Sequence, residues 1–201
     1  MERPERRLLV IGCGAMAREL LEVVRRNGLE GVDVTCLPAR YHNTPQLIAE
    51  AVEERIRSAD ATYDEVFVAY GDCGTGGRLD RVLERHGVER LEGAHCYEFL
   101  AGSAVFNELH DSQPATFYLT DFLVRHFDRL VWKGLGLDRW PQLLPDYFGN
   151  YERVVYLAQT DDPTLTRRAE EAAQRLGLAF EVRRVGYGEL EPALTLRARP
   201  A

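Results

Sequence analysis

The sequence predicts an α/β fold: a single doubly wound, mostly parallel sheet with helices on both faces, in a Rossmann-like three-layer arrangement. Apolar stretches of strand length alternate with amphipathic stretches of helix length along most of the chain. This alternation is typical of parallel sheets with right-handed crossovers. The chain has 201 residues, of which 45% are hydrophobic, and this is enough for one substantial core. We therefore expect residues 1–201 to form a single domain.

The first half of the chain shows the alternation most clearly. Two of its helices carry signals at their ends, because Gly28 is placed for a C-cap and Pro45 for a first helical position. The expected strands lie near residues 7–12, 32–36, 65–70 and 88–95, and the expected helices span residues 15–28, 44–60 and 77–87.

The second half repeats the pattern with one irregular stretch. Its expected strands lie near residues 116–120, 153–158 and 179–188, and its expected helices span residues 96–111, 121–136 and 163–178. The irregular stretch is residues 134–150, which is rich in aromatic residues such as Trp140 and Tyr147. We interpret it as a connection packed on the domain, with a lid or a subunit contact as the alternatives.

Charge and hydropathy exclude two classes of partner. The net charge is −7, whereas a general nucleic-acid binder needs a basic surface to neutralise phosphates. The longest apolar runs have the length of strands and fall short of the roughly 20 residues that cross a bilayer. The N-terminal sequence passes from charged residues directly into an expected strand, without the apolar region of a signal peptide. We therefore expect a cytoplasmic protein that binds neither nucleic acid nor membrane.

The glycine-rich turn "GCGAMA" after the first expected strand resembles a dinucleotide-binding turn. Gly12 and Gly14 would let backbone amides approach a phosphate at a helix N-terminus. Such sites also need an acidic residue at the end of the second strand, but that strand ends in Cys36, Leu37 and Pro38. We therefore predict that the turn does not bind a dinucleotide productively, and keep an NAD(P)-dependent oxidoreductase as the less favoured alternative.

The cysteines give the most informative pattern. The chain has four cysteines, and each one follows or closes one of four successive expected strands. They are Cys13, Cys36, Cys73 and Cys96. The carboxyl ends of parallel strands form one edge of a sheet, and ligands bind in the crevice at that edge. Disulfides are disfavoured in a reducing compartment, and the chain has no C-x-x-C motif of a zinc ribbon or a ferredoxin.

We predict that Cys13, Cys73 and Cys96 ligate a metal ion from separate loops and leave one coordination position open. Zinc is the first choice because thiolate and imidazole ligands suit it, and an iron-sulfur cluster with one open iron is the alternative. Cys36 is left between packing and a fourth ligand. His95 and Glu98 flank Cys96 and are candidates for acid-base catalysis or for ligation.

Five segments carry a family resemblance: "GDCGTGGRLD", "GAHCYEFLAG", "TFYLTDFLVRHFD", "GLGLDRWPQLLPDYFGNY" and "VVYLAQTDD". Together they resemble a bacterial and archaeal family defined only as a domain of unknown function, and the resemblance covers nearly the whole chain. It implies an association with corrinoid-dependent methyltransferases, and hence with one-carbon or methylamine metabolism, but it transfers no residue's role. The "LTDF" segment is one of the family's distinctive parts, and it places Asp121 at a strand end as a further candidate catalytic residue.

These observations favour a metal-dependent enzyme that acts on a small molecule. An open zinc site could lower the pKa of a bound water for hydrolysis, or activate a substrate thiol as a methyl acceptor. The alternative is a non-catalytic accessory module that binds a corrinoid protein or its methyltransferase through the aromatic segment. The sequence leaves the substrate, the metal and homo-oligomer formation open.

Overall fold

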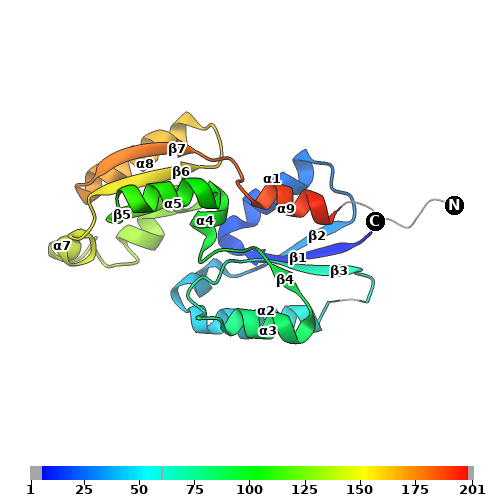
Figure 1. Ribbon diagram of the computed structural model, residues 1–201. Helices are drawn as coiled ribbons and strands as arrows, with labels where there is room; N and C mark the ends of the chain where they lie inside the picture. The colour runs from blue at the N-terminus through cyan, green and yellow to red at the C-terminus, as the bar shows by residue number, and fades with distance from the viewer. Residues whose placement is uncertain (1–5, 60, 199–201) are drawn as a thin grey trace. The chain divides into compact units, whose positions relative to one another are not determined.

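The computed structural model describes residues 6–59 and 61–198, and it confirms the α/β class (Figure 1). The strand pairs that these residues form are all parallel. The strands are divided between two sheets, a four-stranded one in the order β2-β1-β3-β4 and a three-stranded one in the order β5-β6-β7. The chain accordingly divides into two compact units. The first comprises the residues up to Phe99 and those from Tyr187 onward, and the second is Leu100–Gly186.

The prediction that all the strands lie in one sheet is therefore wrong, although their positions and parallel direction are confirmed. Alternating strands and helices predict parallel pairing, but they do not show where a sheet stops. Here β4 has only two residues, Glu89–Arg90, and the Arg90 side chain donates to the carbonyl oxygens of Leu91 and Gly93 just beyond it. A short strand whose neighbouring carbonyls are covered is a common way to end a sheet.

The first unit packs helices on both faces of its sheet (Figure 1). Residues 8–11 of β1 are buried, as expected for a central strand that is covered on two sides. One face carries Leu9 and Ile11, which pack with Val52 of α2 and Leu79 of α3. The elements of this unit are β1 (Leu8–Cys13), α1 (Ala17–Arg26), β2 (Val32–Leu37), α2 (Ile48–Arg57), β3 (Glu65–Ala69), α3 (Arg78–His86), β4, α4 (Cys96–Ala101, which leads into the second unit) and α9 (Leu190–Arg197), with 3-10 turns at Gly14–Met16, Ala39–Asn43 and Pro45–Leu47.

The order of the four strands has a consequence for ligand binding. The chain runs from β1 to β2 on one side and then returns to place β3 on the other side of β1. Between β1 and β3, therefore, the two connections leave the carboxyl edge in opposite directions. In open α/β sheets this topological switch point is the usual position of a ligand crevice.

The second unit is built around β6, of which five of the six residues are buried. Its core includes Leu119 of β5, Tyr156 of β6 and Leu165 of α8. The Arg175 guanidinium lies 4.1 Å from the centre of the Trp132 ring and binds Asp128 at 2.6 Å. The elements of this unit are α5 (Ser103–Ser112), β5 (Thr116–Thr120), α6 (Asp121–Arg125), a π-helix (Asp128–Trp132), a 3-10 turn (Pro141–Leu143), α7 (Leu144–Phe148), β6 (Arg153–Ala158), α8 (Pro163–Leu176) and β7 (Ala179–Arg184).

The irregular segment at residues 134–150 contains the 3-10 turn and α7. Phe148 is buried, with its ring centre 5.3 Å from that of Phe117 in an edge-to-face contact. Trp140 and Tyr147 are 47% and 44% exposed. The segment thus contributes one aromatic residue to the core of the second unit and presents two at its surface. Among the described residues, no helix has the length and apolar character needed to cross a bilayer.

Candidate functional site

The candidate site lies at the carboxyl edge of the four-stranded sheet. Cys13 is the last residue of β1, and Tyr70 directly follows β3. Gly12 is level with Ala69 in the register of these strands, so the next residues, Cys13 and Tyr70, are neighbours across the sheet. Both pack on the face that α2 and α3 cover, and Cys73 packs there as well. The site is therefore at the switch point between β1 and β3.

The turn "GDCGTGG" is organised by Asp72. Its carboxylate accepts hydrogen bonds from the Thr75 hydroxyl at 2.7 Å and from the backbone N–H groups of Gly77 and Gly76 at 2.9 and 3.2 Å. Burial alone would raise the pKa of Asp72, but these hydrogen bonds outweigh it and lower the pKa below its ordinary value. Asp72 is thus an ionised turn-forming residue, and its oxygens are used within the turn.

Cys73 has an unusual backbone conformation in this turn. Its φ is +49°, in the left-handed region that residues other than glycine, asparagine and aspartate rarely adopt. Its N–H donates to the Ala94 carbonyl at 2.7 Å, which ties the turn to the loop before α4. Strained residues of this kind cluster at ligand and active sites, and the strain here falls on a predicted ligand.

The loop before α4 forms the next wall of the site. A side chain at Gly71 would lie 2.9 Å from the backbone of His95, so glycine allows the two segments to pack closely. The Glu98 carboxylate accepts a hydrogen bond from the Ala94 N–H at 2.8 Å, and the His95 ring packs edge-to-face on Tyr97. The sequence analysis placed Glu98 among the catalytic candidates, and the structure gives its carboxylate a role in holding the loop.

The four thiols influence one another electrostatically. Burial, followed by the charge of Cys13, raises the pKa values of Cys36 and Cys73 to about 11 each. Burial and then the charge of Cys73 raise the pKa of Cys96 well above its ordinary value. Thiols at this edge are therefore close enough to oppose one another's ionisation, and they are protonated at neutral pH.

Cys13 and Cys36 lie on opposite faces of the sheet. Cys36 is level with Gly12, and because side chains alternate along a strand, it points to the α1 side whereas Cys13 points to the α2 side. Burial raises the pKa of Cys13, but the Ala15 N–H donates to its sulfur at 3.4 Å and opposes that rise. The structure thus places Cys13 and Cys73 on one face of the sheet and Cys36 on the other.

Tyr70 is a site residue that the sequence analysis missed. Its side chain is 2% exposed, and its hydroxyl has no hydrogen-bond partner of good geometry among the described residues. Burial, followed by the charge of Cys13, raises its pKa far above the ordinary value, so it is a neutral hydroxyl group. The available signal was a phenol at the end of an otherwise apolar strand, next to the glycine-rich turn.

No preformed metal site is present in the described part of the chain. No three histidine, cysteine, aspartate or glutamate side chains of these residues are arranged so that they could hold a metal ion. The four cysteines are free thiols.

The glycines of "GCGAMA" have packing roles. A side chain at Gly14 would lie 2.8 Å from the Leu37 carbonyl oxygen, and one at Gly12 would collide with Leu20 of α1. Asp33, an acidic residue within β2, is bound to Arg7 at 2.6 Å and to the Tyr63 hydroxyl at 2.9 Å. In this structure, therefore, Gly14 allows close packing against the backbone of Leu37, and Gly12 allows close packing against α1.

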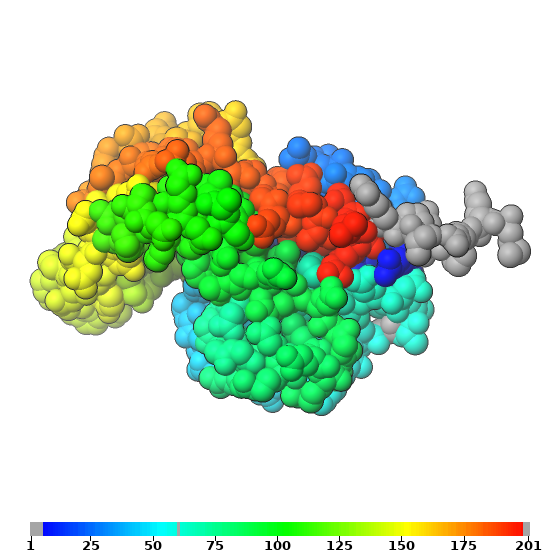
Figure 2. Space-filling view, viewed as in Figure 1, coloured from blue at the N-terminus to red at the C-terminus, as the bar shows by residue number. Residues whose placement is uncertain are grey.

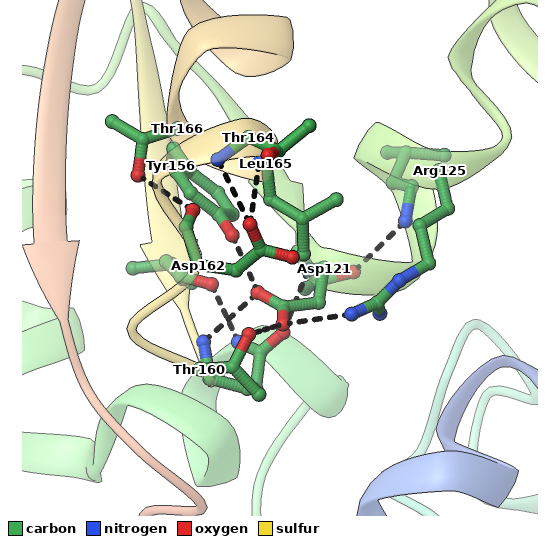
Figure 3. Close-up of polar contacts among 12 residues, drawn as sticks. Asp121, Arg125, Tyr156, Thr160, Asp162, Thr164, Leu165 and Thr166 are labelled. Atoms are coloured by element: carbon green, nitrogen blue, oxygen red, sulfur yellow. Dashed lines mark hydrogen bonds and ion pairs between the residues drawn. The ribbon is translucent and has the colours of Figure 1, made fainter.

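Asp121 lies in the second unit, at the start of α6, and Figure 3 shows its surroundings. The side chain is fully buried. One carboxylate oxygen accepts from the Tyr156 hydroxyl at 2.6 Å and the Gln159 N–H at 3.0 Å, and the other accepts from the Thr160 hydroxyl at 2.5 Å and from Arg125 at 3.4 Å. This carboxylate therefore binds the ends of β5 and β6 together.

A hollow in the first unit lies apart from the thiols. It measures about 700 Å³ and is lined by residues of α3, β4 and α9, whose surfaces are visible in Figure 2. Its arginine residues are already engaged, since Arg197 binds Glu65 and Glu89, and Arg90 binds Asp80. We therefore place the candidate site at the thiols.

Comparison with protein-family models gives a match to a model described as "Protein of unknown function (DUF1638)" over residues 36–194. No curated protein matches the chain. The matched range includes Tyr70, Cys73, Cys96 and Asp121, whereas Cys13 precedes it.

Proposed function

We propose that this chain, which belongs to the DUF1638 family, binds a zinc ion through Cys13, Cys73 and Cys96 and uses it in an enzymatic reaction on a small molecule. The observation that carries the proposal is the position of the thiols. Cys13 and Cys73 lie at the switch point of the parallel sheet, on one face, and the charge of Cys96 is coupled to theirs. The three thiols come from the end of β1, the turn after β3 and the start of α4, and three protein ligands with one open position are usual for catalytic zinc sites.

The chemistry of the donors supports a soft metal ion. Thiolates select zinc, copper(I) or iron-sulfur clusters over hard cations. The raised pKa values of the thiols mean that a bound cation must displace their protons, so that binding is coupled to proton release. The buried Tyr70 hydroxyl is a donor that a thiolate would satisfy. Ligation requires the side chains to turn toward the ion, because in the described conformation they do not form a preformed metal site.

Each neighbouring residue has a task in this proposal. Asp72 keeps the turn of Cys73 in shape, and Glu98 keeps the loop of Cys96 in shape. His95 is adjacent to Cys96 and is our candidate for proton transfer, since its ordinary pKa is near neutrality. A zinc ion bound here would supply a Lewis acid that lowers the pKa of a water or a substrate thiol. The methyl-transfer setting that the family resemblance implies would make a substrate thiol the favoured reactant.

Metal analysis tests the proposal. The protein is purified anaerobically, reduced, and titrated with zinc and with cobalt as a spectroscopic substitute. We expect one ion per chain in the wild type, loss of most binding in Cys73→Ser, and retention in the matched control Cys36→Ser, with unchanged circular dichroism in both.

A wild-type protein that takes up no zinc at micromolar concentration would contradict the proposal. Equal loss of zinc from both variants would contradict the ligand assignment. Recovery of iron together with sulfide would instead identify the iron-sulfur alternative.

A further inference from the structure

We infer that the small-molecule substrate carries an oxyanion, a carboxylate or a phosphate, and that Arg40 and Arg78 bind this group beside the thiols. Assigning the anion to a substrate rests on the proposed function. The anion-binding site itself is independent of the metal ion and is tested without one. The inference adds two residues that are neither metal ligands nor acid-base catalysts.

Both arginines lie at the carboxyl edge of the four-stranded sheet. Arg40 is in the 3-10 turn that follows β2. Arg78 begins α3, directly after the glycine-rich turn that carries Cys73. Because β1, β2 and β3 are parallel, the segments that follow them meet at the edge of the sheet where the thiols lie.

Packing between these segments brings the arginines toward the thiols. A side chain at Gly74 would lie 3.4 Å from the Pro45 ring, so the glycine-rich turn packs against the connection from β2 to α2. The Arg40 guanidinium lies 5.6 Å from the centre of the Tyr41 ring. Tyr41 in turn packs against the same core cluster as Cys13. An anion held by Arg40 would therefore lie beside the thiol edge.

The charges of the two guanidinium groups are not neutralised within the described part of the chain. Both side chains are exposed, and neither forms an ion pair with another described residue. The Arg78 Nε donates to the Thr75 carbonyl oxygen at 3.2 Å. This hydrogen bond holds the side chain against the turn and leaves its two terminal nitrogens without an acceptor among the described residues.

The opposite edge of the same sheet shows the contrast. There Arg6 binds Glu65, the first residue of β3, at 2.6 Å. Arg197 binds Glu65 as well, and also Glu89, the first residue of β4. Ion pairing thus neutralises these arginines at the amino edge, in a chain with a net charge of −7, and is lacking for Arg40 and Arg78 at the carboxyl edge.

The acidic residues near the carboxyl edge are engaged elsewhere. Asp72 uses its carboxylate within its own turn, and Glu98 accepts a hydrogen bond from the backbone of its own loop. Asp80, in the first turn of α3, binds Arg90. Residues 38–47, which connect β2 to α2, contain no aspartate or glutamate. A ligand is therefore the anion that these two arginines are placed to bind.

The guanidinium group fits an oxyanion in charge and in shape. It presents N–H donors in a planar fork, which binds a carboxylate or a phosphate through two parallel hydrogen bonds. Arg78 also begins α3, where the helix dipole disfavours a cation, and a bound anion would offset that cost. Two arginines on neighbouring segments would thus hold the anionic end of a substrate whose reacting end faces the thiols.

Anion titration of the metal-free, reduced protein tests the inference. Sodium phosphate and sodium succinate are the two probes, added at constant ionic strength, and the NMR signals of the arginine Nε–H groups report binding. We expect a millimolar dissociation constant for at least one probe, and the tighter one identifies the anion as phosphate or carboxylate. Binding should weaken about 10-fold in Arg40→Gln and in Arg78→Gln.

Arg55→Gln is the matched control and should leave anion binding unchanged. Arg55 is also exposed and forms no ion pair with another described residue, but it lies in the last turn of α2, away from the carboxyl edge. Circular dichroism checks that the three variants are folded.

Two results would overturn the inference. One is a wild type that binds neither anion saturably, and the other is equal weakening in Arg55→Gln, since any lost positive charge would then have the same effect. The zinc titration of the wild type is read separately. Zinc uptake without anion binding would reject this inference and leave the proposed function standing. Anion binding without zinc uptake would reject the proposed function and leave the anion site standing.

Discussion

The carboxyl edges of the two sheets both carry polar residues at strand ends, but the residues differ in how far they are hydrogen-bonded. In the second unit, Asp121 lies at the end of β5 and each carboxylate oxygen receives hydrogen bonds. In the first unit, Cys13 ends β1 and Cys73 lies in the turn after β3, both as free thiols. The buried Tyr70 hydroxyl beside them makes no hydrogen bond of ordinary geometry with the described residues. The difference teaches that position at a strand end is not enough to identify a functional residue.

What separates the two edges is how far their polar groups are satisfied. A buried carboxylate with a complete set of donors stabilises the fold, and its neighbours depend on it. An unsatisfied hydroxyl and a strained Cys73, with its φ of +49°, reduce stability and need a compensating role. Three variants or conditions sharpen or break this comparison.

The largest effect should come from Asp121→Ala. The substitution leaves the Tyr156 hydroxyl and the Gln159 N–H buried without their acceptor, so we expect a loss of about 3–5 kcal/mol in the free energy of unfolding. Asp161→Ala is the control, because that carboxylate is largely exposed in its ion pair with Arg184, and removing it should cost at most about 1 kcal/mol. Urea unfolding measures both. A loss below about 1 kcal/mol in Asp121→Ala would mean that the two edges do not differ as described.

Alkaline pH should act on the thiol edge. The pKa values of Cys36 and Cys73 in the folded protein are about 11, against an ordinary value of 9.0. Their contribution to stability is complete below pH 9 and is lost as pH rises toward 11, because the unfolded chain ionises first. Between pH 8 and pH 10, the metal-free, reduced protein should lose about 1 kcal/mol per thiol.

The double variant Cys36→Ala and Cys73→Ala isolates this effect. Its stability should fall less between pH 8 and pH 10 than that of the wild type, as measured by urea unfolding under the same conditions. An identical fall in both proteins would show that these thiols ionise normally in the folded state.

The smallest effect concerns the strained backbone. Cys73→Ala and Cys73→Gly both remove the sulfur, but only glycine adopts a φ of +49° without a steric penalty. We expect the glycine variant to be more stable than the alanine variant by about 1 kcal/mol in urea unfolding, with zinc binding lost in both. Equal stability would remove the argument that strain is stored at the site.

Much of the fold could be predicted from the sequence because it depends on local periodicity. The strands expected near residues 116–120 and 153–158 lie at Thr116–Thr120 and Arg153–Ala158, where continuous apolar runs stand out. The division into two sheets could not be predicted, because it depends on whether hydrogen bonding continues beyond Glu89–Arg90. Whether another strand pairs beyond β4 depends on the residues around the sheet edge, and the sequence of β4 alone does not determine it.

The candidate site was predicted in part. The parallel-sheet rule correctly placed Cys13 and Cys73 at one edge, because it follows from chain direction alone. It could not show that the Glu98 carboxylate accepts a hydrogen bond from the Ala94 N–H, or that Asp121 belongs to the second unit. Both facts depend on tertiary contacts. Tyr70 was missed for a related reason: a lack of hydrogen-bond partners is visible only once the surrounding side chains are in place.

The positions of the tryptophan residues, among them Trp132 beneath Arg175, have a practical consequence for spectroscopy. The chain has two tryptophans, Trp132 and Trp140, and both lie in the second unit. Intrinsic tryptophan emission therefore reports on the surroundings of that unit, and the thiol-bearing unit contributes no indole of its own. A fluorescent reporter for the thiol edge has to be introduced, and replacing the buried Phe67 of β3 with tryptophan would place it within the sheet that carries the site.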